Sequence, residues 1–134
     1  DSGMIPYYSE WHSYDSIGLA NAHLAHNVID TAYMDKVSPD MIILYSTTPS
    51  EEGLQLLRNE AFIYEYIKHK GIYRVVGVTK WVDNYYLMIY LKSTIKQYDD
   101  IVKSIEHVGL NSRKFVLNDF DYLKQRYLIF STDN

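Results

Sequence analysis

The chain has 134 residues, a formal net charge of −4 and no cysteine. A chain of this length can bury one hydrophobic core without covalent cross-links, and its 47% hydrophobic and 22% charged residues are typical of a globular protein rather than a disordered or fibrous one. The lack of cysteine excludes disulfides, Cys-ligated zinc and thiol nucleophiles. No basic run occurs in the sequence, which argues against nucleic acid as a partner.

The first 34 residues combine aromatic side chains with a helical pattern. Residues 1–15 carry aromatic side chains without a clean period, which predicts an arm that lies across an apolar surface. Tyrosine is frequent throughout the chain, at 14 residues, and its amphipathic ring suits half-buried positions. From residue 16 to residue 34 apolar side chains recur at helical spacing, which predicts an N-terminal helix over 16–34.

A strand and a well-marked helix are predicted next. Residues 41–46 form a short continuous apolar run, which is typical of an interior strand. Thr48 can cap a helix with its hydroxyl, Pro49 suits the first turn, and Glu51 completes a capping box. Three basic residues followed by Gly71 favour the end of that helix, because they suit its negative pole and glycine accepts the left-handed conformation there.

Residues 72–91 predict an antiparallel hairpin, because they are rich in β-branched and aromatic residues and are interrupted by Asp83-Asn84, which suits a two-residue turn. A second capping box at residues 94–97 predicts a helix that ends at Gly109. Residues 115–117 and 127–130 have strand character. The whole chain, 1–134, is therefore predicted to be one α+β domain with a βαββαβ, ferredoxin-like core over 41–134.

The predicted hairpin has two apolar faces. A two-residue turn would pair Val82 with Tyr85, Trp81 with Tyr86, Thr79 with Met88 and Gly77 with Tyr90. One face, expected to pack on the two capped helices, would then carry Val76, Val78, Val82, Leu87, Ile89 and Leu91. The other, with Val75 and Thr79 among its members, contains the candidate binding residues Tyr73, Trp81, Tyr86, Met88 and Tyr90.

This aromatic face needs cover, because a sheet with one wet face alternates apolar with polar residues and this hairpin does not. Two interpretations stay open. The arm and the helix 16–34 could fold back as a third layer, or the face could bind a partner protein, a second copy of the chain or a ligand. The favoured function is a non-catalytic protein-interaction module.

The alternative function is a small-molecule or metal-binding protein, or a minor enzyme, with a pocket between the helix 16–34 and the sheet. His23 and His26 lie three residues apart on that predicted helix, with Asp30 four residues beyond, and could bind a divalent metal. The longer zinc signature is absent, so a solvated helix face is the competing interpretation. No nucleophile-elbow or phosphate-binding motif occurs, and no cofactor or catalytic residue is predicted.

From about residue 52 onward, the succession of helix, hairpin, helix and strand, followed by the charged segment 116–126, resembles the YhcN/YlaJ-like sporulation lipoproteins. The resemblance implies an extracytoplasmic, lipid-anchored, non-enzymatic protein of a spore-forming bacterium. Asp1 at the start of the chain agrees with a lost lipid-modified cysteine, whereas a start at Met4 would favour the cytoplasm. No apolar run approaches the roughly 18 residues of a spanning helix, so membrane contact is expected only through such an anchor.

Overall fold

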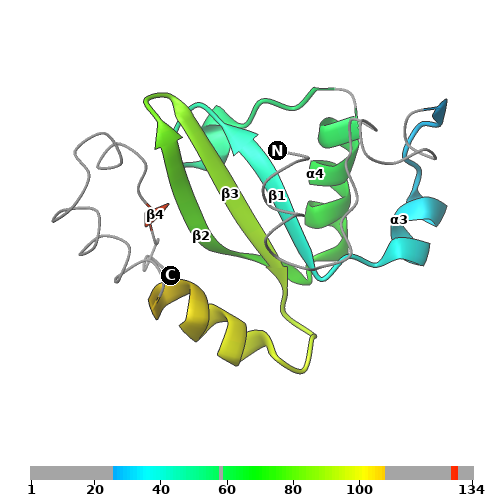
Figure 1. Ribbon diagram of the computed structural model, residues 1–134. Helices are drawn as coiled ribbons and strands as arrows, with labels where there is room; N and C mark the ends of the chain where they lie inside the picture. The colour runs from blue at the N-terminus through cyan, green and yellow to red at the C-terminus, as the bar shows by residue number, and fades with distance from the viewer. Residues whose placement is uncertain (1–25, 58, 108–127, 130–134) are drawn as a thin grey trace, which may run out of the picture.

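The computed structural model describes residues 26–57, 59–107 and 128–129, with the side chains of residues 81, 82, 128 and 129 outside that description. Within these residues, helices and strands form a mixed α+β structure (Figure 1), which confirms the predicted class. A further helix, without a label in Figure 1, covers residues 98–107. The labelled elements are α3 (Thr31–Val37), β1 (Met41–Ser46), the 3-10 turn η1 (Glu51–Gly53), α4 (Asn59–Lys70), β2 (Tyr73–Val82), β3 (Tyr85–Lys92) and β4 (Leu128–Ile129).

The sheet has the order β1-β3-β2-β4, and each neighbouring pair is antiparallel. Because β1 and β2 both run against β3, they are parallel to each other, and α4 joins them with β3 between. This is a split βαβ unit. The two residues of β4 lie beside β2, at the edge away from β1.

The hairpin agrees with the sequence-based prediction in its position and turn. Its strands are β2 and β3, and the turn between them is Asp83-Asn84, with Asn84 at a positive φ of 60°. Asparagine tolerates this left-handed conformation because its short polar side chain bonds locally. The predicted strand 41–46 is confirmed as β1.

The predicted pairing within the hairpin is wrong beyond the first pair, Val82 with Tyr85. Irregularities in β2, between Val75 and Gly77 and between Lys80 and Val82, insert extra residues opposite β3. Each bulge shifts the register, so the two faces of the hairpin are not the two sets of alternate residues expected from the turn. Tyr86, Met88 and Tyr90 pair with Lys80, Val78 and Val75 rather than with Trp81, Thr79 and Gly77.

Both predicted capping boxes fall before the helices that they were expected to start. The first, at Thr48 to Glu51, leads into η1, and α4 begins only at Asn59. Here the chain doubles back along β1: the backbone N–H of Gln55 donates to the carbonyl of Tyr45 at 3.0 Å. The second predicted helix begins at residue 98 rather than 94. The predicted end of α4 is confirmed, since Gly71 has a φ of 65° and its N–H bonds the carbonyl of Ile67.

The predicted helix 16–34 is interrupted where the structure describes it, since residue 26 and residues 31–34 are helical and the residues between them are not. Residues 27–30 are not helical, and α3 begins at Thr31, after the predicted helix was expected to be nearly complete. Asp30 caps α3, since its side chain accepts a hydrogen bond of 2.7 Å from the N–H of Tyr33. The predicted arm 1–15, the helical residues 16–25, the strand 115–117 and the helix end at Gly109 lie outside the described residues.

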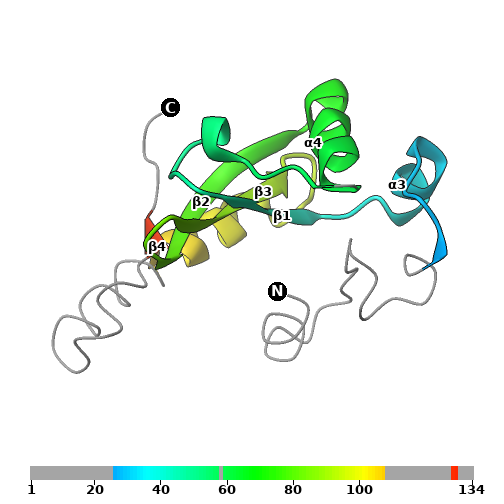
Figure 2. The same cartoon turned by 90° about the horizontal axis from the view of Figure 1, so that it is seen from above.

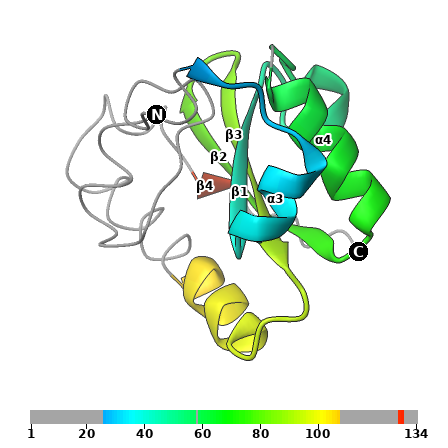
Figure 3. The same ribbon diagram turned by 90° about the vertical axis from the view of Figure 1, so that its right-hand side faces the viewer.

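The described elements form layers on one side of the sheet (Figures 2 and 3). α4 packs on this side, and α3 lies beyond it. The helix of residues 98–107 lies off the end of the sheet at which β3 finishes, away from α4. Among the described residues, no helix is both long and apolar enough to cross a membrane.

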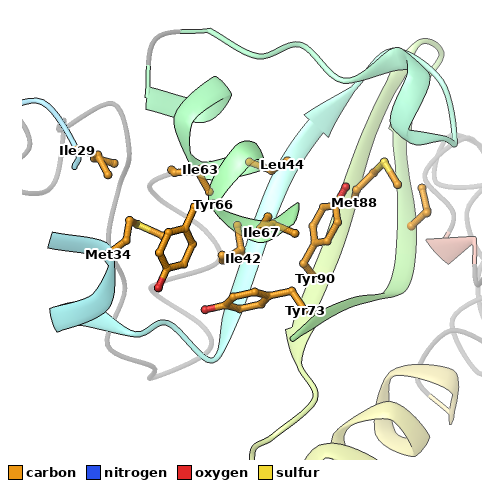
Figure 4. Close-up of a cluster of buried hydrophobic side chains, with 11 residues drawn as sticks. Ile29, Met34, Ile42, Leu44, Ile63, Tyr66, Ile67, Tyr73, Met88 and Tyr90 are labelled. Carbon is orange, nitrogen blue, oxygen red and sulfur yellow. The ribbon is translucent and has the colours of Figure 1, made fainter. Parts of the chain in front are cut away.

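Side chains of β1, β2, β3, α3 and α4 meet in one core (Figure 4). We call the side of the sheet that faces α4 the covered face. Paired residues share a face of an antiparallel sheet, so its members follow from the register. The covered face comprises Ile42, Leu44, Tyr73, Val78, Met88 and Tyr90.

A turn at residues 38–40 joins α3 to the sheet. Ser38 has a positive φ of 45° and ends α3. The carbonyl of Pro39 accepts a hydrogen bond of 2.8 Å from the Tyr73 hydroxyl. Lys92 is only 9% exposed, and its ammonium group donates to the carbonyl of Ser38 at 2.7 Å, to its hydroxyl at 3.0 Å and to the Asp40 carboxylate at 3.0 Å. These contacts attach the turn to the end of β3.

Candidate functional site

The residues predicted to form an aromatic binding face lie mostly in the core. Tyr73, Met88 and Tyr90 are 5%, 3% and 1% exposed and point toward α4 (Figure 4). Tyr86 lies on the same face of β3 but is half-buried. The side chain of Trp81 is not among those that the structure describes. The cover is α4, which had been expected on the other face, because the bulges of β2 place Val78 with the tyrosines.

The hydroxyls of the buried tyrosines donate hydrogen bonds to acceptors within the protein. The Tyr90 hydroxyl donates to the Glu51 carboxylate of η1 at 2.9 Å. Burial is the main cause that raises the pKa of Tyr90, and the hydrogen bond to Glu51 adds to it. Burial likewise raises the pKa of Tyr73 to about 12. These two hydroxyls therefore stay protonated and hold neighbouring loops against the covered face.

The other side of the sheet carries a second apolar surface, which we call the distal face. Its side chains alternate with those of the covered face along β1 and β3. All are half-buried except Leu91, which pairs with Met41 and is 0% exposed. The helices α3 and α4 and the turn η1 lie on the opposite side (Figure 3). The distal face comprises Met41, Ile43, Tyr45, Tyr85, Leu87, Ile89 and Leu91.

An antiparallel sheet with one solvated face usually places polar residues at every second position. Neither β1 nor β3 follows this rule, since each distal-face position holds an aliphatic or aromatic residue. The sequence-based expectation of a hairpin with two apolar faces therefore holds for β3. The distal face is the surface that the described helices leave for other contacts.

Two tyrosines stack at the end of the distal face near the hairpin turn. The rings of Tyr45 and Tyr85 have centroids 4.3 Å apart and planes inclined by 29°. The Tyr45 hydroxyl donates to the exposed carbonyl of Asn84 at 3.2 Å. The sequence did not predict this pair, because the two tyrosines are 40 residues apart. The predicted βαββαβ order implies that β1 lies next to β3, but the missing information was the register that pairs Tyr45 with Leu87.

Only one of the two histidines predicted as metal ligands lies among the described residues. His26 is exposed at the start of the described residues, and His23 lies outside them. Among the described residues, no group of three or more His, Cys, Asp or Glu side chains is placed to hold a metal ion.

In the described part of the predicted helix 16–34, α3 packs on α4, and the predicted pocket beside residues 16–25 stays a prediction. Met34 is buried beside Tyr66 (Figure 4). The Tyr66 hydroxyl and the Lys70 ammonium both contact the same carboxylate oxygen of Asp35, each at 2.7 Å. The hydrogen bond from Lys70, and then the one from Tyr66, lower the pKa of Asp35.

The geometry defines an α+β domain in which one helix covers a split βαβ sheet and the second sheet face is apolar as well. The family model described as "Domain of unknown function (DUF8728)" matches residues 1–99. The chain therefore belongs to this family, since the match covers well over half of its 134 residues. The match includes β1, α4 and the whole hairpin. No curated protein and no solved structure matches the chain.

Proposed function

We propose that this protein is a non-catalytic interaction module that binds another protein, or a second copy of itself, through the distal face. The observation that carries the proposal is the run of half-buried apolar residues on β1 and β3, at positions where a solvated sheet would be polar. Such a surface suits a partner that is itself apolar. Each aliphatic side chain that becomes fully buried can contribute about 1.5–3 kcal/mol relative to full exposure, and a half-buried one contributes less.

The shape of the sheet supports the same function. The covered face is closed by α4 and the hydroxyls of its tyrosines already have partners. The distal face has a rigid backbone, because both of its strands are paired with neighbours. A rigid apolar surface loses little conformational entropy on binding, which favours recognition of a preformed partner surface.

Charge substitutions on the distal face test this function. In Ile43→Glu and Leu87→Glu we expect native circular dichroism and a loss of stability of about 1 kcal/mol, which leaves the chain folded. Both variants should also lose association in sedimentation experiments over a range of protein concentrations. A partner other than the chain itself would be tested by immunoprecipitation from cells that make the protein, and the same two variants should lose it.

Met88→Glu is the matched control, since Met88 adjoins Leu87 in sequence but is 3% exposed on the covered face. This variant should fail to fold, because a buried unpaired carboxylate is strongly unfavourable. If Ile43→Glu and Leu87→Glu unfold the chain as Met88→Glu does, the distal face belongs to the interior of the protein and the interaction proposal is wrong.

The extracytoplasmic, lipid-anchored location implied by the sequence resemblance belongs to the same proposal. The support for it is the succession of helix, hairpin, helix and strand from about residue 52 onward. Expression from the natural first codon, followed by membrane fractionation and mass measurement, tests it. A lipid-modified cysteine upstream of Asp1 is the expected result, and a soluble product with no modified cysteine would contradict it.

The ferredoxin-like order is likewise part of the proposal rather than of the described fold. The order β1-β3-β2 supports it, as does the split βαβ connection through α4. A ferredoxin-like sheet would place its last strand beside β1, whereas β4 lies beside β2. Cross-strand amide contacts measured by nuclear magnetic resonance would decide which strand is the neighbour of β1.

A further inference from the structure

The stacked tyrosines of the distal face have a geometry suited to a covalent modification. We propose that Tyr45 and Tyr85 are a site of oxidative coupling, at which the two rings join through a carbon–carbon bond to give an intrachain dityrosine between β1 and β3. The inference goes beyond the proposed interaction function and does not depend on it, because it requires an oxidant and no protein partner.

The distance between the rings carries the proposal. Their centroids lie 4.3 Å apart with an inclination of 29°, so ring carbons of the two side chains are already near van der Waals contact. Tyr45 pairs with Leu87, which makes Tyr85 its diagonal neighbour on β3. Diagonal neighbours have Cα atoms about 7–8 Å apart, a span that two tyrosine side chains can bridge without movement of the strands.

Access by oxidants is the second requirement. Both rings are half-buried rather than enclosed, and the hydrogen bond from Tyr45 to Asn84 lies at the surface. The phenolic protons can therefore leave to water when the rings are oxidised. No acidic or basic side chain of the protein is needed for this step.

Hydrogen peroxide is the oxidant that takes up the electrons and protons released when the two tyrosines couple. Each phenol loses one electron and its hydroxyl proton to give a phenoxyl radical. The two radicals join at the ring carbons next to the oxygens, and the hydrogens on those carbons then move to the oxygens through water, which restores two phenols. The pair has lost two electrons and two protons, and a haem peroxidase passes them to one hydrogen peroxide, which becomes two waters.

The Tyr66 and Tyr73 pair provides an internal comparison. Its ring centroids are 6.4 Å apart with planes inclined by 53°. These rings are 8% and 5% exposed, and their hydroxyls donate to Asp35 and to the carbonyl of Pro39. The greater distance and the burial should both prevent coupling of this pair.

A dityrosine would give this chain a covalent link that it cannot otherwise make, because it has no cysteine. A bond between β1 and β3 would close a covalent loop that contains α4 and β2. A cross-link of this kind stabilises mainly by restricting the conformations of the unfolded chain. We therefore expect the coupled protein to melt at a higher temperature than the untreated one.

The test is treatment of the folded chain with peroxidase and hydrogen peroxide, followed by trypsin and mass spectrometry. Trypsin isolates Tyr45 as the single tyrosine of the peptide 37–58, and places Tyr85 in the peptide 81–92. The expected product is a joined pair of these peptides, lighter than their sum by two hydrogen atoms, with fragmentation that locates the bond at Tyr85. A mixture of ¹⁵N-labelled and unlabelled chains should give only joined peptides of a single label.

Tyr45→Phe and Tyr85→Phe should abolish the joined product, whereas the matched variant Tyr86→Phe should retain it, since Tyr86 points to the opposite face. The wild-type product alone decides the matter if a variant folds poorly. The proposal is overturned if no coupling occurs, if the main product joins another tyrosine pair, or if the joined peptides carry mixed labels and so come from two chains.

Discussion

The two faces of the central sheet contain the same kinds of residue but differ in burial and in the contacts that they make. The covered face holds Tyr73, Met88 and Tyr90 at 5%, 3% and 1% exposure, with the tyrosine hydroxyls tied to Pro39 and Glu51. The distal face holds a stacked tyrosine pair and aliphatic residues that, apart from the buried Leu91, are only half-buried. The difference teaches that tyrosine content alone does not locate a functional surface. The partner of each hydroxyl and the depth of each ring separate core tyrosines from surface ones.

The largest effect should come from adjacent substitutions on the two faces. Met88→Ala removes a buried side chain from the covered face and should lower the free energy of unfolding by about 2–5 kcal/mol. Leu87→Ala, one residue away on the distal face, should cost about 1 kcal/mol, because the side chain is only half-buried. Urea denaturation of both variants measures the difference. Equal losses would show that the distal face is packed as tightly as the covered one.

A smaller effect is expected where η1 closes the end of the covered face. A Cβ at Gly53 would lie 2.6 Å from the backbone nitrogen of Thr48 and 2.7 Å from the hydroxyl of Ser46. Gly53→Ala must therefore displace the loop, at a cost of about 1–3 kcal/mol. The displacement should also disturb the contact between Glu51 and Tyr90, which near-ultraviolet circular dichroism would detect.

Gly71→Ala is the control for this substitution. A Cβ at Gly71 would meet nothing within 4 Å, so the cost comes only from its positive φ of 65° and should be about 1 kcal/mol. The near-ultraviolet spectrum should not change. A spectral change in Gly71→Ala equal to that in Gly53→Ala would contradict the role assigned to η1.

The smallest effect concerns α3, which packs on α4. The pKa of Asp35 is lowered in the folded protein by Lys70 and Tyr66. Its contribution to stability is therefore complete above the ordinary pKa of aspartate, about 3.9, and is lost as the pH falls through the lower folded value. We expect the melting temperature of the wild type to fall more steeply than that of Asp35→Asn over this acidic range. Parallel profiles would show that the contact does not stabilise the fold.

The sequence was sufficient for the elements whose signals are local. The turn at Asp83-Asn84, the strand 41–46 and the helix end at Gly71 all depend on a few neighbouring residues, and each is where the pattern predicts it. The starts of α4 and of the helix 98–107 were missed, because Ser, Thr, Pro and Glu suit a tight turn as well as a helix start. Thr48 to Glu51 form such a turn against β1.

The positions of the strands could be predicted better than the sets of residues that share each face of the sheet. Tyr86, Met88 and Tyr90 were correctly placed on one face of β3, since alternation within a strand is fixed. Their β2 partners were wrong because a bulge leaves no sequence signal that period-2 alternation can detect. The Tyr45 and Tyr85 stack depends on the register between β1 and β3, a property of the strand pair rather than of either segment.

The contacts of Lys92 bear on how the chain folds. The hairpin closes through a two-residue turn, whereas Lys92 reaches Ser38 across a sequence separation of 54 residues. Closing a longer loop costs more entropy, and nonlocal strand pairing tends to be slow. We therefore expect the hairpin to form first and β1 to join it later. Loss of the Lys92 ammonium should then speed unfolding while it leaves the folding rate nearly unchanged.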